Sequence, residues 1–118
     1  MTSLIACLSS GKGTWAHVDK LIEEQEWDNI FLITNEFGIK NFKPNKKVEY
    51  VVIDSNKFLS EIIEDIKKQL ENKIADTEVA LNFISGTGKE HMALLSAVLK
   101  LGMGIRLTAL TPNGVKEI

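Results

Sequence analysis

Two glycine-containing loops carry the residue types in this chain that are best suited to chemistry. The first reads Ser9-Ser10-Gly11-Lys12-Gly13-Thr14, and the second reads Ser85-Gly86-Thr87-Gly88-Lys89. Glycines let the backbone approach a ligand closely, hydroxyls donate to phosphate oxygens, and lysine adds positive charge. A purely structural turn needs a glycine and a cap, but it does not need a lysine in each loop. These residue types therefore indicate a site for an anion or a nucleotide.

A helical pattern follows each of the two loops. The first helix begins near residue 14, with apolar residues at helical spacing, and the second covers residues 90–101. Free N–H groups and the helix dipole favour negative charge at a helix N-terminus, which suits both loops to an anion. The inward-facing residues are expected to be Trp15, Val18, Leu21 and Ile22 in the first helix, and Met92, Leu95, Val98 and Leu99 in the second.

The elements that position the loops alternate between strand and helix. Apolar runs predict strands over 4–8, 29–34, 48–53, 78–84 and 105–110, and a third, long amphipathic helix is expected over 57–73. Residues 35–47 are polar, residues 111–114 read as a turn, and the last four residues either begin another element or fray. Continuous apolar strands that alternate with helices are typical of a parallel sheet covered on both faces.

We therefore predict one domain over residues 1–118, a three-layer Rossmann-like α/β fold. Right-handed crossovers give a mainly parallel five-stranded sheet in the order 3-2-1-4-5, with helices on both faces. The switch point of such a sheet lies between the first and fourth strands, and ligands bind at the carboxyl ends of strands there. The loops 9–14 and 85–89 leave those two strands, so the topology predicts that they meet.

Several established glycine and metal motifs do not fit this sequence. A Walker A loop fails because Gly88-Lys89 is followed by Glu90, and the dinucleotide fingerprint is incomplete because residue 16 is Ala16. Cysteine and histidine lack zinc spacing, and a nucleophile elbow is missing. We expect neither a metal nor a cofactor.

Composition limits the partners and the compartment. The 118 residues carry a net charge of −2, so global charge gives no support to binding of duplex DNA. The single cysteine, Cys7, lies in an apolar run and is read as a buried small hydrophobe rather than a thiol nucleophile. A lone cysteine fits a reducing compartment. Neither a signal peptide nor an apolar stretch of about 20 residues is seen, so a cytoplasmic location without a membrane partner is expected.

The segment Ala80-Leu81-Asn82-Phe83-Ile84-Ser85-Gly86-Thr87-Gly88-Lys89 resembles the signature of CARF domains, the CRISPR-associated Rossmann-fold sensors. That signature is an apolar strand with an asparagine near its end, a Thr-Gly-Gly-Thr-Lys-like loop, an apolar helix and a Leu-Gly exit. The exit is matched by Leu101-Gly102, and the loop 9–14 stands where the family has its other ligand-contacting segment.

The resemblance implies a stand-alone CARF-like homodimer whose crevices join across a two-fold axis and bind a cyclic oligoadenylate. Such a domain either senses this messenger or cleaves it as a metal-independent ring nuclease, in which a ribose 2′-hydroxyl attacks its own phosphate. The residues this implies for catalysis are Lys89, Ser10, Lys12 and His91. The implied ligand contacts are Ser9, Ser10, Gly11, Lys12, Gly13, Thr14, Asn35, Asn82, Ser85, Gly86, Thr87, Gly88 and Lys89.

Three of the residues near these loops have two interpretations each. The ring of Trp15 either stacks on adenine or packs in the core, and its helical spacing favours the core. The amide of Asn82 either contacts the ligand or satisfies a loop backbone group. The ring of His91 is either the acid–base group or an ordinary helix-surface histidine. The competing function is a nucleotide- or phosphometabolite-binding enzyme or regulatory subunit that has no part in CRISPR signalling.

Overall fold

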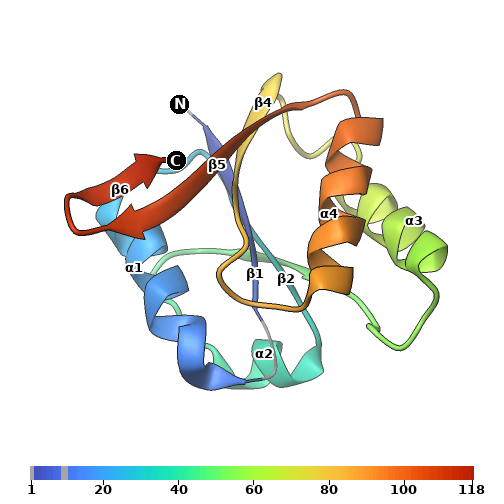
Figure 1. The fold of residues 1–118 in the computed structure, drawn as a ribbon, viewed down its shortest axis with the longest axis horizontal. Coiled ribbons are helices and arrows are strands. Elements are labelled where there is room, and N and C mark those ends of the chain that lie inside the picture. Colours follow the sequence, from blue (N-terminus) through green and yellow to red (C-terminus); the bar gives the residue numbers. More distant parts are fainter. Residues whose placement is uncertain (1, 9–10) are drawn as a thin grey trace.

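A six-stranded sheet forms the middle layer of the computed structural model, which describes residues 2–8 and 11–118 (Figure 1). Its order is β3-β2-β1-β4-β5-β6, and β1 to β5 run parallel to one another. The strands are β1 (Ser3–Cys7), β2 (Ile30–Thr34), β3 (Glu49–Val52), β4 (Glu78–Asn82), β5 (Gly104–Thr111) and β6 (Gly114–Glu117).

The predicted order of the first five strands is confirmed, but the predicted number of strands is wrong by one. The sixth strand, β6, pairs antiparallel with β5 and extends the sheet at that edge. The hairpin closes because Gly114 adopts a φ of 99°, a conformation that glycine takes without steric cost. The Thr111 hydroxyl also donates to the Gly114 carbonyl at 2.8 Å. A turn pattern alone could not show whether the last residues pair with the sheet.

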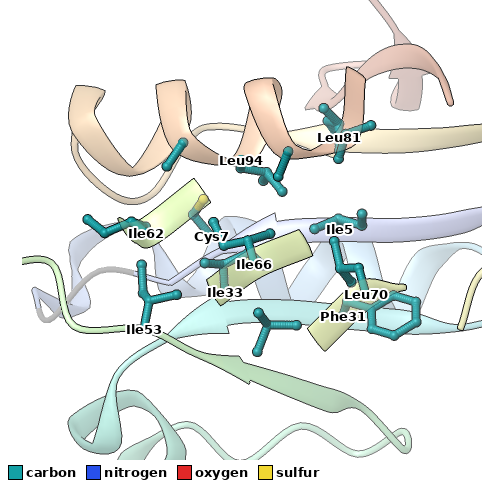
Figure 2. Packing of buried hydrophobic residues seen from close by; sticks show 14 of the residues in the cluster. Ile5, Cys7, Phe31, Ile33, Ile53, Ile62, Ile66, Leu70, Leu81 and Leu94 are labelled. Carbon is teal, nitrogen blue, oxygen red and sulfur yellow. The ribbon is translucent and has the colours of Figure 1, made fainter. Parts of the chain in front are cut away.

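Helices cover both faces of the sheet, as predicted. One face carries α1 (Trp15–Glu24), which follows the short 3-10 turn η1 (Lys12–Thr14), and the other carries α3 (Leu59–Leu70) and α4 (Gly88–Lys100). Between β2 and β3 the chain forms the short helix α2 (Glu36–Asn41). Figure 2 shows the larger core, where side chains of α3 and α4 meet those of β1, β2 and β4.

The outer face of α4 is where the sequence prediction fails. Met92, Leu95 and Leu99 were expected to face inward, but they are 59%, 36% and 57% exposed. The buried positions are Ala93, Leu94, Ala97 and Val98. The helix is apolar around its whole circumference over residues 92–99, with Ser96 as the one polar side chain, so its periodicity could not identify the inner face. The small alanines let α4 pack closely against α3 and the sheet.

Candidate functional site

The carboxyl ends of β1 and β4 lie side by side, which places the two glycine loops at one edge of the sheet. Ala6 of β1 is in register with Asn82 of β4. Gly86 has a φ of 101°, and a Cβ there would come within 3.1 Å of the Cys7 Cβ. Only glycine fits such a backbone in so little space. The second loop therefore packs directly against the end of β1, from which the first loop leaves.

The first loop presents a lysine over aromatic rings. Ser9 and Ser10, two of its predicted ligand contacts, lie outside the described residues. Gly11, Lys12 and Gly13 are exposed and Thr14 is partly buried. The ammonium of Lys12 lies 5.8 Å from the ring centroids of both Trp15 and Phe37. A cation at this distance is attracted to the ring faces, which holds the positive charge near the end of β2.

The helix that follows the second loop, α4, carries a carboxylate of its own, that of Glu90, at its N-terminus. The Thr87 hydroxyl accepts the N–H of Glu90 at 3.2 Å, and the Glu90 carboxylate accepts the N–H of Thr87 at 2.8 Å. This capping box satisfies N–H groups at the start of α4 and places a carboxylate at the positive end of its dipole. A ligand phosphate near this loop must therefore be attracted by side chains rather than by the helix end.

Lys89 and His91 both engage backbone carbonyls. The Lys89 ammonium donates to the Ser55 carbonyl in the loop after β3 at 2.9 Å. Nε2 of His91 donates to the Ser85 carbonyl at 2.7 Å, since a carbonyl can only accept, and the ring stacks on Phe83 at 4.9 Å. The Lys89 side chain is exposed and keeps further N–H donors for a ligand. His91 is instead bound to its own loop.

Asn82 belongs to a buried network and is 3% exposed. Its amide donates to the Thr108 carbonyl at 2.9 Å and lies 3.4 Å from Nε2 of His17, and its Oδ1 accepts the N–H of Ile84 at 3.3 Å. The Leu110 N–H also donates to Nε2 of His17, at 3.2 Å. This supports the interpretation of Asn82 as a residue that satisfies backbone groups. His17, which joins α1 to β5, was missed as its partner.

This network predicts a pH-dependent stability. Nε2 of His17 accepts from Leu110, so the ring is neutral with its proton on Nδ1, and burial lowers the pKa of His17 below 6.5. Below pH 6.5 the unfolded chain therefore binds more protons than the folded chain at this ring, and the free energy of unfolding falls as the pH falls. One proton gives a slope of at most about 1.4 kcal/mol per pH unit. Urea unfolding from pH 7.5 to pH 5 measures it.

The matched variants for this prediction are His17→Gln and His91→Gln. The first should flatten the pH dependence near and below pH 6.5, because it removes the titrating ring. The second should retain the dependence, because the His17 ring and its contacts are unchanged. Equal slopes in the wild type and in His17→Gln would show that the network does not titrate as described.

Three other residues discussed from the sequence have structural contacts. The side chain of Asn35 accepts the N–H of Gly38 at 3.1 Å and caps α2. Trp15 is 8% exposed and packs edge-on against Phe42 at 5.6 Å, which supports its core interpretation. Cys7 is 1% exposed, and its burial, with a contribution from Glu90, raises the pKa of the thiol far above its ordinary value. Cys7 is therefore a poor nucleophile.

A pocket of about 590 Å³ opens at the carboxyl ends of β2 and β3. Both lysines of the candidate site reach its lining, Lys12 through Phe37 and Lys89 through the Ser55 carbonyl. Sequence reasoning missed Phe37, Asp54 and Ser55 as members of the site. The signal that could have found them is position, since each lies shortly after the end of a parallel strand.

The structure is that of an α/β protein with a mostly parallel sheet, and its pocket at the carboxyl ends of β2 and β3 lies to one side of the switch point between β1 and β4. A scan against protein-family models finds no match, and a comparison with curated proteins finds no similar sequence. Within residues 2–8 and 11–118, no helix is both long and apolar enough to span a bilayer. In the same residues, no group of three or more histidine, cysteine or acidic side chains is placed to hold a metal ion.

Proposed function

We propose that this protein binds a cyclic oligoadenylate, a ring of nucleotides joined by phosphates, in the crevice at the carboxyl edge of its sheet. The observation that carries the proposal is that each of the two loop lysines contacts a residue that lines one pocket. Lys12 lies 5.8 Å from the Phe37 ring, and Lys89 lies 2.9 Å from the Ser55 carbonyl. Phe37 and Ser55 both line the 590 Å³ pocket.

The charges around the crevice favour a ligand with separated phosphates. Glu90 fills the start of α4, so Lys12 and Lys89 are the positive groups of the two described loop segments. Two ammonium groups that contact different residues of one pocket lining suit a ligand that presents its phosphates apart, as a cyclic oligonucleotide does. The resemblance of residues 80–89 to the CARF signature supports the same ligand class.

The proposed role is binding and sensing, with ring cleavage as the outcome to be tested against it. His91, the acid–base residue that the resemblance implies, donates Nε2–H to its own loop carbonyl, which does not favour proton transfer to a ligand. Incubation with labelled cyclic tetra- and hexa-adenylate distinguishes the roles. We expect binding without turnover. Linear products would instead identify a ring nuclease, and the absence of binding to either ring would overturn the proposal.

We also propose that two copies associate through the outer face of α4 and the uncovered surface of β5. Met92, Leu95 and Leu99 are exposed on α4, and Leu107 on β5 is 42% exposed. An apolar hollow of about 240 Å³ lies on β4 and β5 beside Leu107 and Ile118. Leu81 and Ile105, on these two strands, belong to the same core cluster as the inner side of α4, so helix and hollow share one face of the sheet.

A second copy of the chain is the partner that fits this surface best. The exposed α4 positions 92, 95 and 99 carry no charge, so two negatively charged copies can meet there without like-charge repulsion. Helices that are apolar all round are normally buried, whereas α1 and α3 carry charged outer faces. The dimer face begins one turn after the second glycine loop, so association would bring the two crevices near each other.

Replacing Lys89 should weaken the ligand while the fold stays intact. Charge-assisted hydrogen bonds contribute about 1.5–3 kcal/mol, so Lys89→Ala should raise the Kd for cyclic tetra-adenylate about tenfold or more. The melting temperature should change little, because the Lys89 contact with Ser55 is exposed. Titration calorimetry and thermal unfolding measure the two effects. The control is Lys100→Ala, at the other end of α4, and equal affinities for the two variants would remove Lys89 from the site.

A further inference from the structure

The pocket at the carboxyl ends of β2 and β3 differs in charge from the two lysines beside it. It is lined by residues 35–37, by residues 52–57 and by Asp65 of α3. Its volume of about 590 Å³ lies in the range of about 300–1,000 Å³ that small-molecule sites occupy. In Figure 1 the chain passes from β2 into α2 at the lower edge of the molecule, and residues 35–37 of this segment line the pocket.

The pocket offers an aromatic surface that is both exposed and held in place. Phe37 is 41% exposed, although its ring lies 6.0 Å from the buried ring of Trp15. The backbone beside it is fixed, because the Asn35 side chain caps the same short helix. An aromatic ring with one part packed and another part open is the usual platform on which a nucleobase stacks.

The charges of the lining exclude phosphate from the pocket itself. Three carboxylates, Glu36, Asp54 and Asp65, stand against one lysine, Lys57. That lysine is already paired with Asp65 at 3.1 Å. Carboxylates repel phosphate but accept hydrogen bonds from ribose hydroxyls and from exocyclic amines. The pocket therefore suits the uncharged part of a nucleotide.

The positive groups of the two loops contact residues that line the pocket without lining it themselves. Lys12 lies over the Phe37 ring, and Lys89 donates to the Ser55 carbonyl. This division of charge matches the division within a nucleotide, whose base and sugar are neutral and whose phosphate is an anion. We propose that the pocket binds the base and ribose of one nucleotide of the ligand, with the base on Phe37 and the ribose at Glu36 or Asp54. The inference rests on the proposed function, since it assumes that the ligand is a nucleotide.

The experiment uses two probes, adenosine 5′-monophosphate and cyclic tetra-adenylate, each titrated into isotope-labelled protein and followed by amide chemical shifts. We expect both probes to shift amides in residues 35–37 and 52–57. Base–aromatic stacking contributes about 1–3 kcal/mol, so Phe37→Ala should raise the Kd of the monophosphate about tenfold. Phe37→Leu, which retains apolar packing on Trp15 but removes the ring, should give a similar increase.

The control is Phe58→Ala, which removes a ring that is 79% exposed and does not line the pocket. Its Kd should equal that of the wild type. If the amide shifts are confined to residues 11–14 and 85–91, and Phe37→Ala has the Kd of the wild type, the pocket proposal is overturned. The proposed function would still stand. Pocket shifts with the monophosphate but none with the cyclic probe would support the pocket and overturn the cyclic ligand. The absence of amide shifts with either probe would overturn both the pocket and the proposed function.

Discussion

Replacing Leu95 and Leu99 together by glutamate should convert a dimer of twice 13.1 kDa into a monomer of 13.1 kDa. Both side chains lie on the outer face of α4, where they are 36% and 57% exposed. In a dimer built on this face, the two glutamates would be removed from water without a partner. Burying an unpaired charge costs several kcal/mol, which is a large part of the free energy that holds a small interface together. Sedimentation equilibrium measures the change in mass.

The matched control is Lys68→Glu on α3. It alters the net charge by −2, as the double replacement does, but at an exposed position away from α4. The control should remain a dimer. Because the two leucines contact solvent in the single chain, the double variant should keep the circular dichroism of the wild type. A wild type that sediments at 13.1 kDa, or a double variant that stays dimeric, would contradict the proposed interface.

Gly38→Ala should destabilise the protein by about 2 kcal/mol, although helix propensity predicts the opposite sign. Gly38 lies inside α2, where alanine normally gains about 1 kcal/mol over glycine. A Cβ at this position, however, would overlap the Thr34 hydroxyl. Thr34 is 2% exposed, so its side chain has little room to move, and overpacking of a buried site costs about 1–3 kcal/mol.

The displaced Thr34 hydroxyl would also lose a hydrogen bond. Thr34 Oγ1 donates to the Leu8 carbonyl at 3.1 Å and ties the end of β2 to the end of the first strand, just before the first glycine loop. A buried hydrogen bond of this kind contributes about 1 kcal/mol. The overlap and this lost bond together outweigh the gain in helix propensity. Urea unfolding of the wild type and the variant measures the net effect.

The double variant Gly38→Ala with Thr34→Ala separates overlap from every other cause. Thr34→Ala alone should cost about 1 kcal/mol through the lost hydrogen bond. Adding it to Gly38→Ala removes the overlapping hydroxyl, so the pair should be less destabilised than the sum of the single changes. Additive costs would show that the two side chains do not collide, and a stabilised Gly38→Ala would show that propensity decides at this position.

Much of the fold follows from the sequence because strands and crossovers are governed by local pattern and handedness. The buried strands Ser3–Cys7 and Ile30–Thr34 are apolar apart from the terminal Ser3 and Thr34, as is typical of parallel strands covered on both faces. The order of the first five strands then follows from right-handed crossovers. The sixth strand depends instead on whether the last residues pair with a distant edge, which a four-residue turn pattern does not specify.

The adjacency of the two strand ends was predictable from the sequence, but the contacts of the loop side chains were not. The sequence by itself determined that two glycine loops leave neighbouring strands, since strand order fixes which carboxyl ends are adjacent. Only the tertiary structure decided that Lys89 reaches Ser55, that Asn82 pairs with His17, and that Phe37 lines a pocket. The first of these contacts joins two residues that are 34 positions apart in the sequence, and the second joins two that are 65 positions apart. Such contacts depend on how whole elements pack, which local spacing does not encode.

The buried face of α4 was not predictable for the same reason, because it also depends on how whole elements pack. The sequence established an apolar helix after the second loop, but its circumference from Met92 to Leu99 is almost uniformly apolar. A periodic pattern identifies a buried face only where polar residues mark the opposite one. The close packing of Ala93 and Ala97 against the rest of the core decided the orientation, and it left Leu95 and Leu99 directed outward. Within residues 2–8 and 11–118 nothing covers those two leucines, so their burial requires a further surface.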